Sequence, residues 1–173
     1  QTYFNLFYQF KSRIIRPMGL TIALISPDGG GKSSVIEGLE NTCLGCFHGI
    51  EKKYFRPGLL KNIGFYNPIN PTKESLKNPN PHSVKTDSFL KSLIRFIFYN
   101  LDFVFGYFLV VYRLKVMRKL IIFDRYYYDY FVDMKRHKLN LPYFLPRIFF
   151  HLVPKPDILF ILDAPEDIIF RRK

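Results

Sequence analysis

The stretch LTIALISPDGGGKS, residues 20 to 33, decides the predicted fold. Residues 20 to 25 are almost all apolar and are bounded by Gly19 and Pro27, which predicts a short buried strand. The next residues match the phosphate-loop pattern Gly-x-x-x-x-Gly-Lys-Ser/Thr, with Ser26 in place of the first glycine. We therefore expect a strand, a phosphate-binding loop and then a helix over residues 32 to 44.

The chemistry of this loop predicts a nucleoside triphosphate as its ligand. Glycines let the backbone curl so that successive N–H groups point at one anion, and the helix that follows adds its positive end. Lys32 would reach the β- and γ-phosphates, and the hydroxyl of Ser33 would ligate Mg²⁺. We expect ATP and Mg²⁺ as cofactors, bound by Asp28, Gly29, Gly30, Gly31, Lys32, Ser33 and Ser34. The alternative is a glycine-rich turn that contains Lys-Ser by chance. The predicted strand before the loop and the predicted helix after it favour the phosphate-binding interpretation.

The rest of the chain predicts an α/β fold of the P-loop NTPase type. Short apolar or mixed runs predict further strands at residues 53–56, 120–123 and 157–162, and helical patterns fall at 89–119, 126–137, 142–152 and 165–173. Alternating strands and helices indicate a parallel sheet with helices on both faces. Ligands bind beyond the carboxyl ends of such strands, so Asp124 and Arg125 should lie beside the phosphate loop.

Length, charge and cysteine content narrow the class of protein. The 173 residues suggest one domain, and the net charge of +12 suits a phosphorylated ligand. Lys and Arg are spread along the chain, which argues against a nucleic-acid-binding site. Cys43 and Cys46 lack the further ligands of a zinc site and are interpreted as thiols in a reducing cytosol. We expect a cytoplasmic protein, since residues 1 to 30 show no secretory signal pattern.

Three segments stand apart from this core. Residues 1–19 predict an amphipathic helix that docks on its own domain, on a partner or on a membrane, with the first as the expectation. Residues 57–88, rich in Pro, Asn and Lys, predict a long irregular insertion within the domain of residues 20–173. The stretch Phe96 to Tyr112 is very apolar but contains Asp102 and is shorter than the roughly 20 residues that a span requires, which favours a buried core helix.

Several motifs, taken in chain order, resemble those of the thymidylate-kinase-like branch of the P-loop nucleoside and nucleotide kinases. The loop of that family reads Gly-x-Asp-Gly-x-Gly-Lys-Ser/Thr, which is similar to residues 26–33, including Asp28. The remaining similar segments are Arg56-Pro57-Gly58, Asp124-Arg125-Tyr126, Pro156-Asp157 and Leu162-Asp163-Ala164-Pro165-Glu166-Asp167.

The resemblance implies roles for the residues in these motifs. Asp124 would hold Mg²⁺ through water, and Arg125 would grip the acceptor's phosphate or the group in transfer. Arg56 and Tyr126 would face the acceptor. Lys32, Asp124 and Arg125 are thus the expected catalytic residues. The alternative for Asp124 and Arg125 is a surface ion pair at a strand end.

The chain also departs from the family pattern. Asp129 stands where the family has Ser, and Asp133 lies one turn further along. These two carboxylates could bind an acceptor hydroxyl or pair with Lys or Arg, and both readings stay open. An arginine in clear register to read a thymine base is lacking. The family's lid would continue from Arg171 and Arg172, so the lid and the last strand are expected to be missing.

The resulting prediction is a kinase that transfers the γ-phosphoryl group of ATP to a nucleoside monophosphate-like acceptor. The expected partner is a small phosphorylated molecule, with no nucleic acid and no membrane, and with a homodimer allowed. The alternatives are an ATP-binding regulatory module without catalysis, a kinase for a non-nucleotide acceptor, and a membrane-associated protein that uses residues 1–19 and 96–112.

Overall fold

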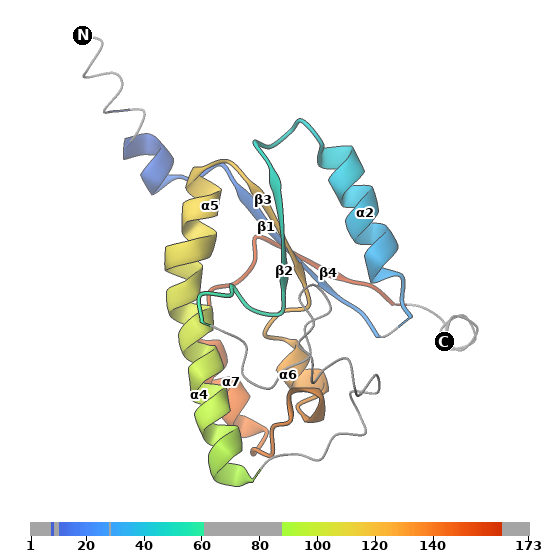
Figure 1. Ribbon diagram of the computed structural model, residues 1–173, viewed down its shortest axis with the longest axis vertical. Helices are drawn as coiled ribbons and strands as arrows, with labels where there is room; N and C mark the ends of the chain where they lie inside the picture. Colours follow the sequence, from blue (N-terminus) through green and yellow to red (C-terminus); the bar gives the residue numbers. More distant parts are fainter. Residues whose placement is uncertain (1–7, 9–10, 28, 61–87, 164–173) are drawn as a thin grey trace.

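A four-stranded parallel sheet organises the molecule (Figure 1). The computed structural model describes residue 8 and residues 11–27, 29–60 and 88–163. The strands lie in the order β2-β3-β1-β4, and each neighbouring pair is parallel. Their bounds are β1 Leu20–Ile25, β2 Ile50–Tyr54, β3 Leu120–Asp124 and β4 Ile158–Ile161.

The central strand β1 is buried on both faces because helices cover both sides of the sheet. Successive side chains of a strand point to opposite faces. Ile22 and Leu24 pack with Ile36 of helix α2 (Lys32–Cys43), whereas Ala23 packs with Phe103 of helix α4 (Phe89–Gly106) in the other core cluster. This confirms the predicted α/β fold with a parallel sheet between two helical layers.

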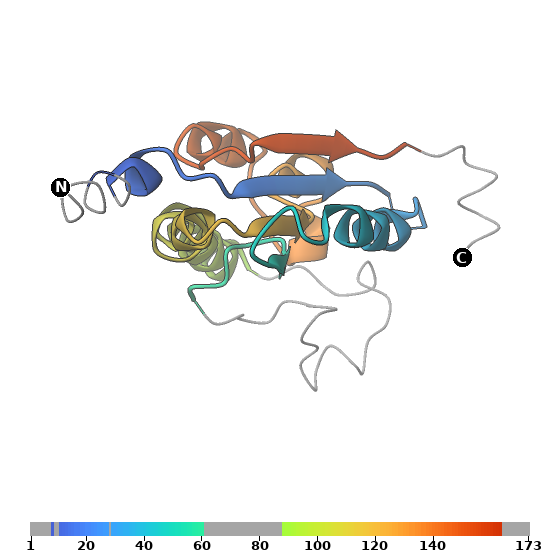
Figure 2. The same ribbon diagram turned by 90° about the horizontal axis from the view of Figure 1, so that it is seen from above.

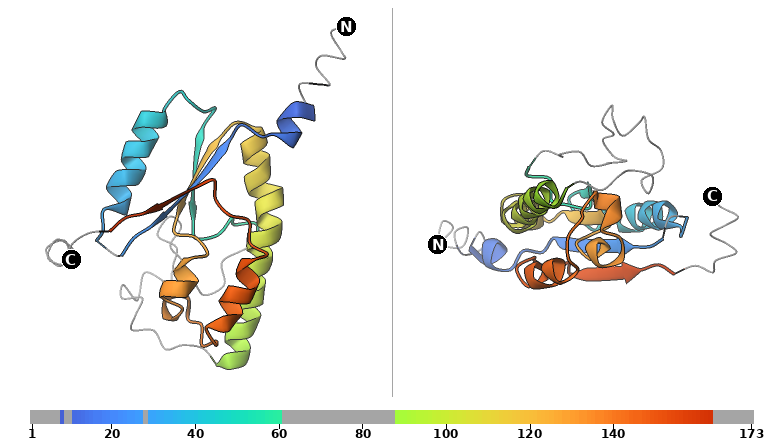
Figure 3. Two further views of the ribbon diagram at one scale, coloured as in Figure 1. Left: turned by 180° about the vertical axis from the view of Figure 1, so that it is seen from behind. Right: turned by 90° about the horizontal axis from the view of Figure 1, so that it is seen from below.

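A long helix and several short ones form the layer opposite α2 (Figures 2 and 3). The helix runs without a break through α4, the π-helical segment η1 (Tyr107–Val111) and α5 (Tyr112–Val116). Helix α7 (Phe144–Phe150) lies beside α4, where the rings of Phe96 and Phe149 meet edge to face. Aromatic rings fill this layer, and the fully buried ones include Phe55, Phe96, Tyr99, Phe103, Tyr127 and Tyr130.

Several predicted boundaries are wrong, for backbone reasons. The single helix expected at 126–137 is divided into α6 (Asp129–Val132) and the 3₁₀ helix η2 (Lys135–His137), and Lys138 at φ 57° ends the second one. Strand β2 ends at Tyr54 rather than at residue 56, because Phe55 adopts φ 62°. A left-handed residue cannot continue a strand.

The segments that the sequence set apart are described only in part. Residues 11–15, within the segment 1–19, are helical and their side chains are exposed, and the full extent of this helix stays a prediction. Most of the predicted insertion at 57–88, and the segment from 164 to 173 with Pro165, Glu166, Asp167, Arg171 and Arg172, lie outside the described residues.

Candidate functional site

The loop between β1 and α2 needs its glycines for two different reasons. Gly29 and Gly31 have φ values of 88° and 86°, a region that other residues rarely adopt. Gly30 is required by space, since a Cβ there would lie 1.9 Å from the Oγ of Ser26 and 3.1 Å from the carbonyl oxygen of Pro27. The N–H of Gly30 donates to that same carbonyl, at 3.1 Å, which closes the turn.

The N-terminus of α2 faces into this loop. Gly31 is the residue that caps the helix, and within the described part of the chain no side chain caps it. The first N–H groups of any helix have no acceptor inside the helix and carry its positive end, so they attract an anion. The Nζ of Lys32 donates to the carbonyl oxygen of Ser26 at 3.2 Å, which holds the ammonium across the loop. Asp28, also expected to bind the nucleotide, lies outside the described residues.

The sheet places Asp124 next to the start of the loop. In the parallel register Leu24 of β1 pairs with Asp124 of β3, so both strands end at the same level. Asp124 and Ser33 line one cavity of about 590 Å³, together with Ile36, Glu37, Glu40, Lys52 and Ile122. A hydroxyl and a carboxylate are hard oxygen donors of the kind that Mg²⁺ prefers when phosphates complete its shell. The residues at this position therefore fit the predicted metal.

Arg125 is held by a buried carboxylate. Its backbone adopts φ 73°, its N–H donates to the carbonyl of Leu24 at 3.0 Å, and its Nη1 lies 2.9 Å from Oδ1 of Asp129. The other carboxylate oxygen of Asp129 lies 3.1 Å from Nε2 of His137. Pairing with Lys or Arg was one of the two readings of Asp129, and its contact with Arg125 is of that kind. A role in binding the acceptor stays a prediction.

The charge states in this cluster follow from burial and from the neighbouring groups. Burial acts to raise the pKa of Asp129, but the hydrogen bond with His137 and the charge of Arg125 lower it below its ordinary value. Burial lowers the pKa of His137, and the nearby carboxylate only partly opposes this. We infer an ionised Asp129 between the guanidinium of Arg125 and a neutral imidazole.

Arg56 is clamped in the same way, and by a residue that sequence reasoning assigned no role in the site. Its Nη1 lies 2.6 Å from Oδ2 of Asp102, with both side chains at most 2% exposed. Asp102 also accepts hydrogen bonds from the N–H groups of Gly58, Leu59 and Leu60. The sequence did carry a signal, since Asp102 is the lone acid in a very apolar helix. The predicted role of Arg56 toward the acceptor stays a prediction.

Three further residues named by the sequence motifs have partners within the fold. Tyr126 is buried, its hydroxyl donates to the carbonyl of Pro154 at 2.6 Å, and burial raises its pKa. Asp133 accepts a hydrogen bond from the N–H of Arg136 at 3.1 Å. Asp157 joins β4 to β1, since it accepts from the N–H and hydroxyl of Thr21 at 2.7 and 2.6 Å. The structure thus brings Lys32, Ser33, Asp124 and Arg125 to one edge of the sheet.

Comparison with models of protein families and with curated proteins finds no match. Among solved structures, the chain is similar to the thymidylate kinase from Ehrlichia chaffeensis. The sequence identity is 19% and the TM-score is 0.48, and the alignment covers 88% of this chain and 77% of that one. The fold itself is established by the sheet order and the two helical layers described above.

Proposed function

We propose that this chain binds Mg²⁺ and ATP at residues 26–33 and transfers the γ-phosphoryl group to a small acceptor. One observation carries the proposal: a glycine loop opens a helix, Lys32 reaches across it, and Ser33 and Asp124 face the same cavity. A triphosphate seated in the loop would lie next to Ser33, which lines that cavity.

The chain's own residues would act by position and charge. The loop N–H groups would hold the β- and γ-phosphate oxygens, and Lys32 would leave Ser26 to offset the charge that develops on the group in transfer. Ser33 and Asp124 would hold Mg²⁺, which neutralises phosphate charge. Arg125, whose guanidinium contacts Asp129, would lie at the edge of the sheet close to the group in transfer.

The acceptor of first choice is a nucleoside monophosphate-like molecule, as the sequence motifs suggest. A second candidate is a kinase whose acceptor carries a hydroxyl but no phosphate. It is favoured by the pairing of both Arg56 and Arg125 with buried carboxylates, because paired charge attracts a phosphate less strongly. Glu37 and Glu40, which line the cavity, could accept hydrogen bonds from hydroxyl groups.

Two measurements test the proposal. The first is the affinity for Mg·ATP of the wild type, of Lys32→Ala and of a matched control, Lys135→Ala, at an exposed lysine of η2. We expect Lys32→Ala to lose about 10- to 100-fold in affinity, since a hydrogen bond to a charged group is worth about 1.5–3 kcal/mol. Equal affinity in all three proteins contradicts nucleotide binding by this loop.

The second measurement is ADP formation with a panel of nucleoside monophosphates, nucleosides and sugars. Transfer to a monophosphate supports the first candidate, and transfer only to an unphosphorylated hydroxyl supports the second. Binding of ATP with no transfer to any acceptor would mean a non-catalytic ATP-binding module.

A further inference from the structure

The long helix exposes a continuous apolar stripe on the side away from the sheet. The six residues of this outer stripe are between 42% and 65% exposed, and they recur at intervals of three or four, which places them on one helix face. They are Leu90, Ile94, Ile97, Leu101, Phe105 and Phe108. Soluble surfaces rarely present so long a row of large apolar side chains, so the stripe indicates an interaction site.

The opposite face of the same helix prevents it from crossing a bilayer. The segment Phe89–Val116 is long and apolar enough to span, with a mean hydropathy of 1.6, and 39% of its most apolar window is buried. That buried part carries Asp102, which is bonded to Arg56 and to three backbone N–H groups. Insertion across a membrane would break this clamp in a medium that offers no replacement partners. The helix can lie on a lipid surface, but it cannot span one while the domain stays folded.

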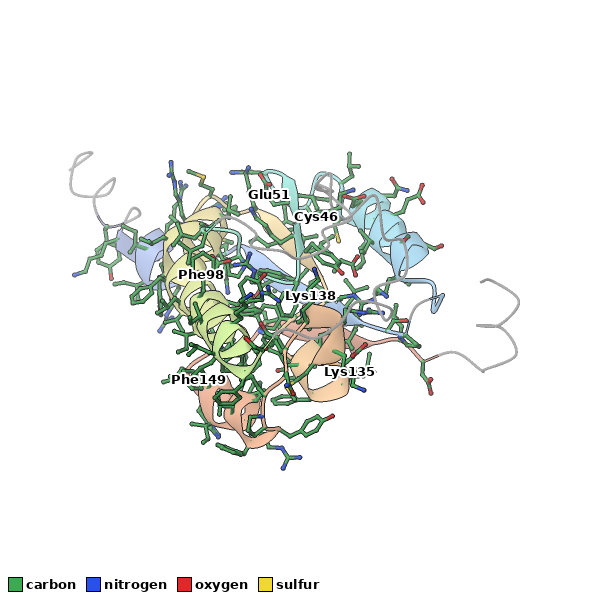
Figure 4. The ribbon with its side chains drawn as sticks, turned by 60° about the horizontal axis from the view of Figure 1, so that its bottom comes forward. Cys46, Glu51, Phe98, Lys135, Lys138 and Phe149 are labelled. Carbon is green, nitrogen blue, oxygen red and sulfur yellow. The ribbon has the colours of Figure 1, made fainter. Side chains whose placement is uncertain are left out.

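Among the described residues of the long helix, the exposed charges are all basic. Asp102 is the single acid of the helix and is buried, whereas the basic residues Lys91 and Arg113 are exposed. Helix α7 lies beside α4 and adds an exposed Arg147. Figure 4 shows Phe98 of α4 and Phe149 of α7 on the same side of the molecule.

The helical residues 11–15, near the end of α5, also expose both apolar and basic side chains. They expose Ile14 and Ile15 beside Lys11 and Arg13, and the hydroxyl of Tyr112 in α5 donates to the carbonyl of Ile14. The net charge of +12 has the same sign. Exposed basic side chains therefore occur near both ends of the long helix, at Lys91 and at Arg113 with the neighbouring residues 11–15.

We propose that the outer stripe docks on an anionic lipid surface, with the helix in the plane of the membrane. Apolar side chains would enter the boundary between headgroups and acyl chains, while Lys91, Arg113 and Arg147 would meet lipid phosphates. A second copy of the chain fits the described charges less well, because two such helices would bring exposed basic residues together, and Asp102, the acid of the helix, is buried. This proposal does not depend on the proposed kinase activity.

Vesicle co-sedimentation of the full 173-residue chain tests the proposal. The probes are phosphatidylcholine vesicles with and without about 30% phosphatidylglycerol, a content that gives a negative surface potential. The variant Ile97→Gln/Phe105→Gln changes two exposed stripe residues, and Leu44→Gln, after the end of α2, is the matched control at an exposed leucine. We expect binding to the anionic vesicles, weakened about tenfold or more by the stripe variant and unchanged by the control.

Further measurements distinguish binding of lipid from binding of a second copy of the chain at the stripe. Lys91→Gln/Arg113→Gln should weaken binding to anionic vesicles, and added salt should weaken it too, since surface charges are screened. Failure of the wild type to bind anionic vesicles overturns the proposal. So does a concentration-dependent dimer in gel filtration that the stripe variant abolishes, because the stripe would then be covered by a second copy.

Discussion

Lys32 and the pair Arg56 and Arg125 lie at the same edge of the sheet, yet the fold treats their charges differently. The described acceptor of Lys32 is a neutral carbonyl in a glycine loop, at 3.2 Å. The two arginines are buried and each contacts a buried carboxylate. A buried ion pair must stay intact to hold the fold, whereas Lys32 is half-buried in a glycine loop at the start of a helix, where an anion would bind. The loop should therefore govern binding, and the arginine clamps should govern stability.

The largest expected effect is on stability, from Asp102→Asn. The change removes the negative charge that lies 2.6 Å from the buried guanidinium of Arg56, which should lower the free energy of unfolding by about 3–5 kcal/mol. Urea denaturation measures it. The control is Glu40→Gln, which removes the exposed ion pair with Lys52, 3.0 Å apart, and should cost about 0–1 kcal/mol. Similar losses in the two variants would remove the distinction between clamp and surface pair.

A somewhat smaller loss is expected from Asp129→Asn, since Asp129 has the side chains of Arg125 and His137 as partners but lacks the three backbone donors of Asp102. We expect about 3 kcal/mol at neutral pH, at the lower end for a broken buried pair. The variant should also lose more of its phosphoryl-transfer activity than of its ATP affinity, because Arg125 loses its contact with the carboxylate of Asp129.

The pH dependence of stability sharpens the test of Asp129. Its pKa is lower in the folded chain than in the unfolded chain, so the ionised carboxylate stabilises the fold above the unfolded pKa. That contribution disappears as the pH falls through the folded pKa. Asp129→Asn should therefore flatten the acid side of the stability profile, and an unchanged acid slope would argue against an ionised Asp129.

Two glycines in helices provide the next comparison. A Cβ on Gly106 would lie 2.8 Å from Oδ1 of Asp102 and 2.9 Å from Cβ of Pro57, so Gly106→Ala should destabilise by about 1–3 kcal/mol through overpacking. A Cβ on Gly38 of α2 would have no heavy atom within 4 Å, so Gly38→Ala should stabilise by up to about 1 kcal/mol through helix propensity. In thermal unfolding, the Tm should fall in Gly106→Ala and rise in Gly38→Ala.

The smallest expected change in stability is that of Lys32→Ala. We expect the free energy of unfolding to stay within about 0.5 kcal/mol of the wild type, because Lys32 is only half-buried and lies outside both core clusters. ATP affinity should fall in the same protein, as measured by calorimetry. A large loss of stability would mean that Lys32, like the buried ion pairs of Arg56 and Arg125, mainly stabilises the fold.

Much of the fold could be predicted because its signals are local. An apolar run between Gly19 and Pro27 predicted β1, and the structure has a strand at Leu20–Ile25. The glycine positions predicted a turn into a helix at Lys32, where α2 begins. The prediction of one helix over 126–137 was wrong, because the break at Asp133 depends on how α6 and η2 pack into the aromatic layer.

The sequence by itself determined the strand, the glycine turn and the helix start, since backbone sterics and helix ends act over a few residues. It also placed Asp124 and Arg125 at a strand end. Only the tertiary structure decided that Arg56 is clamped by Asp102, 46 residues away, and that one face of the long helix stays exposed. Such pairings depend on the sheet order and on helix packing, because a buried charge takes whichever partner the fold brings within reach.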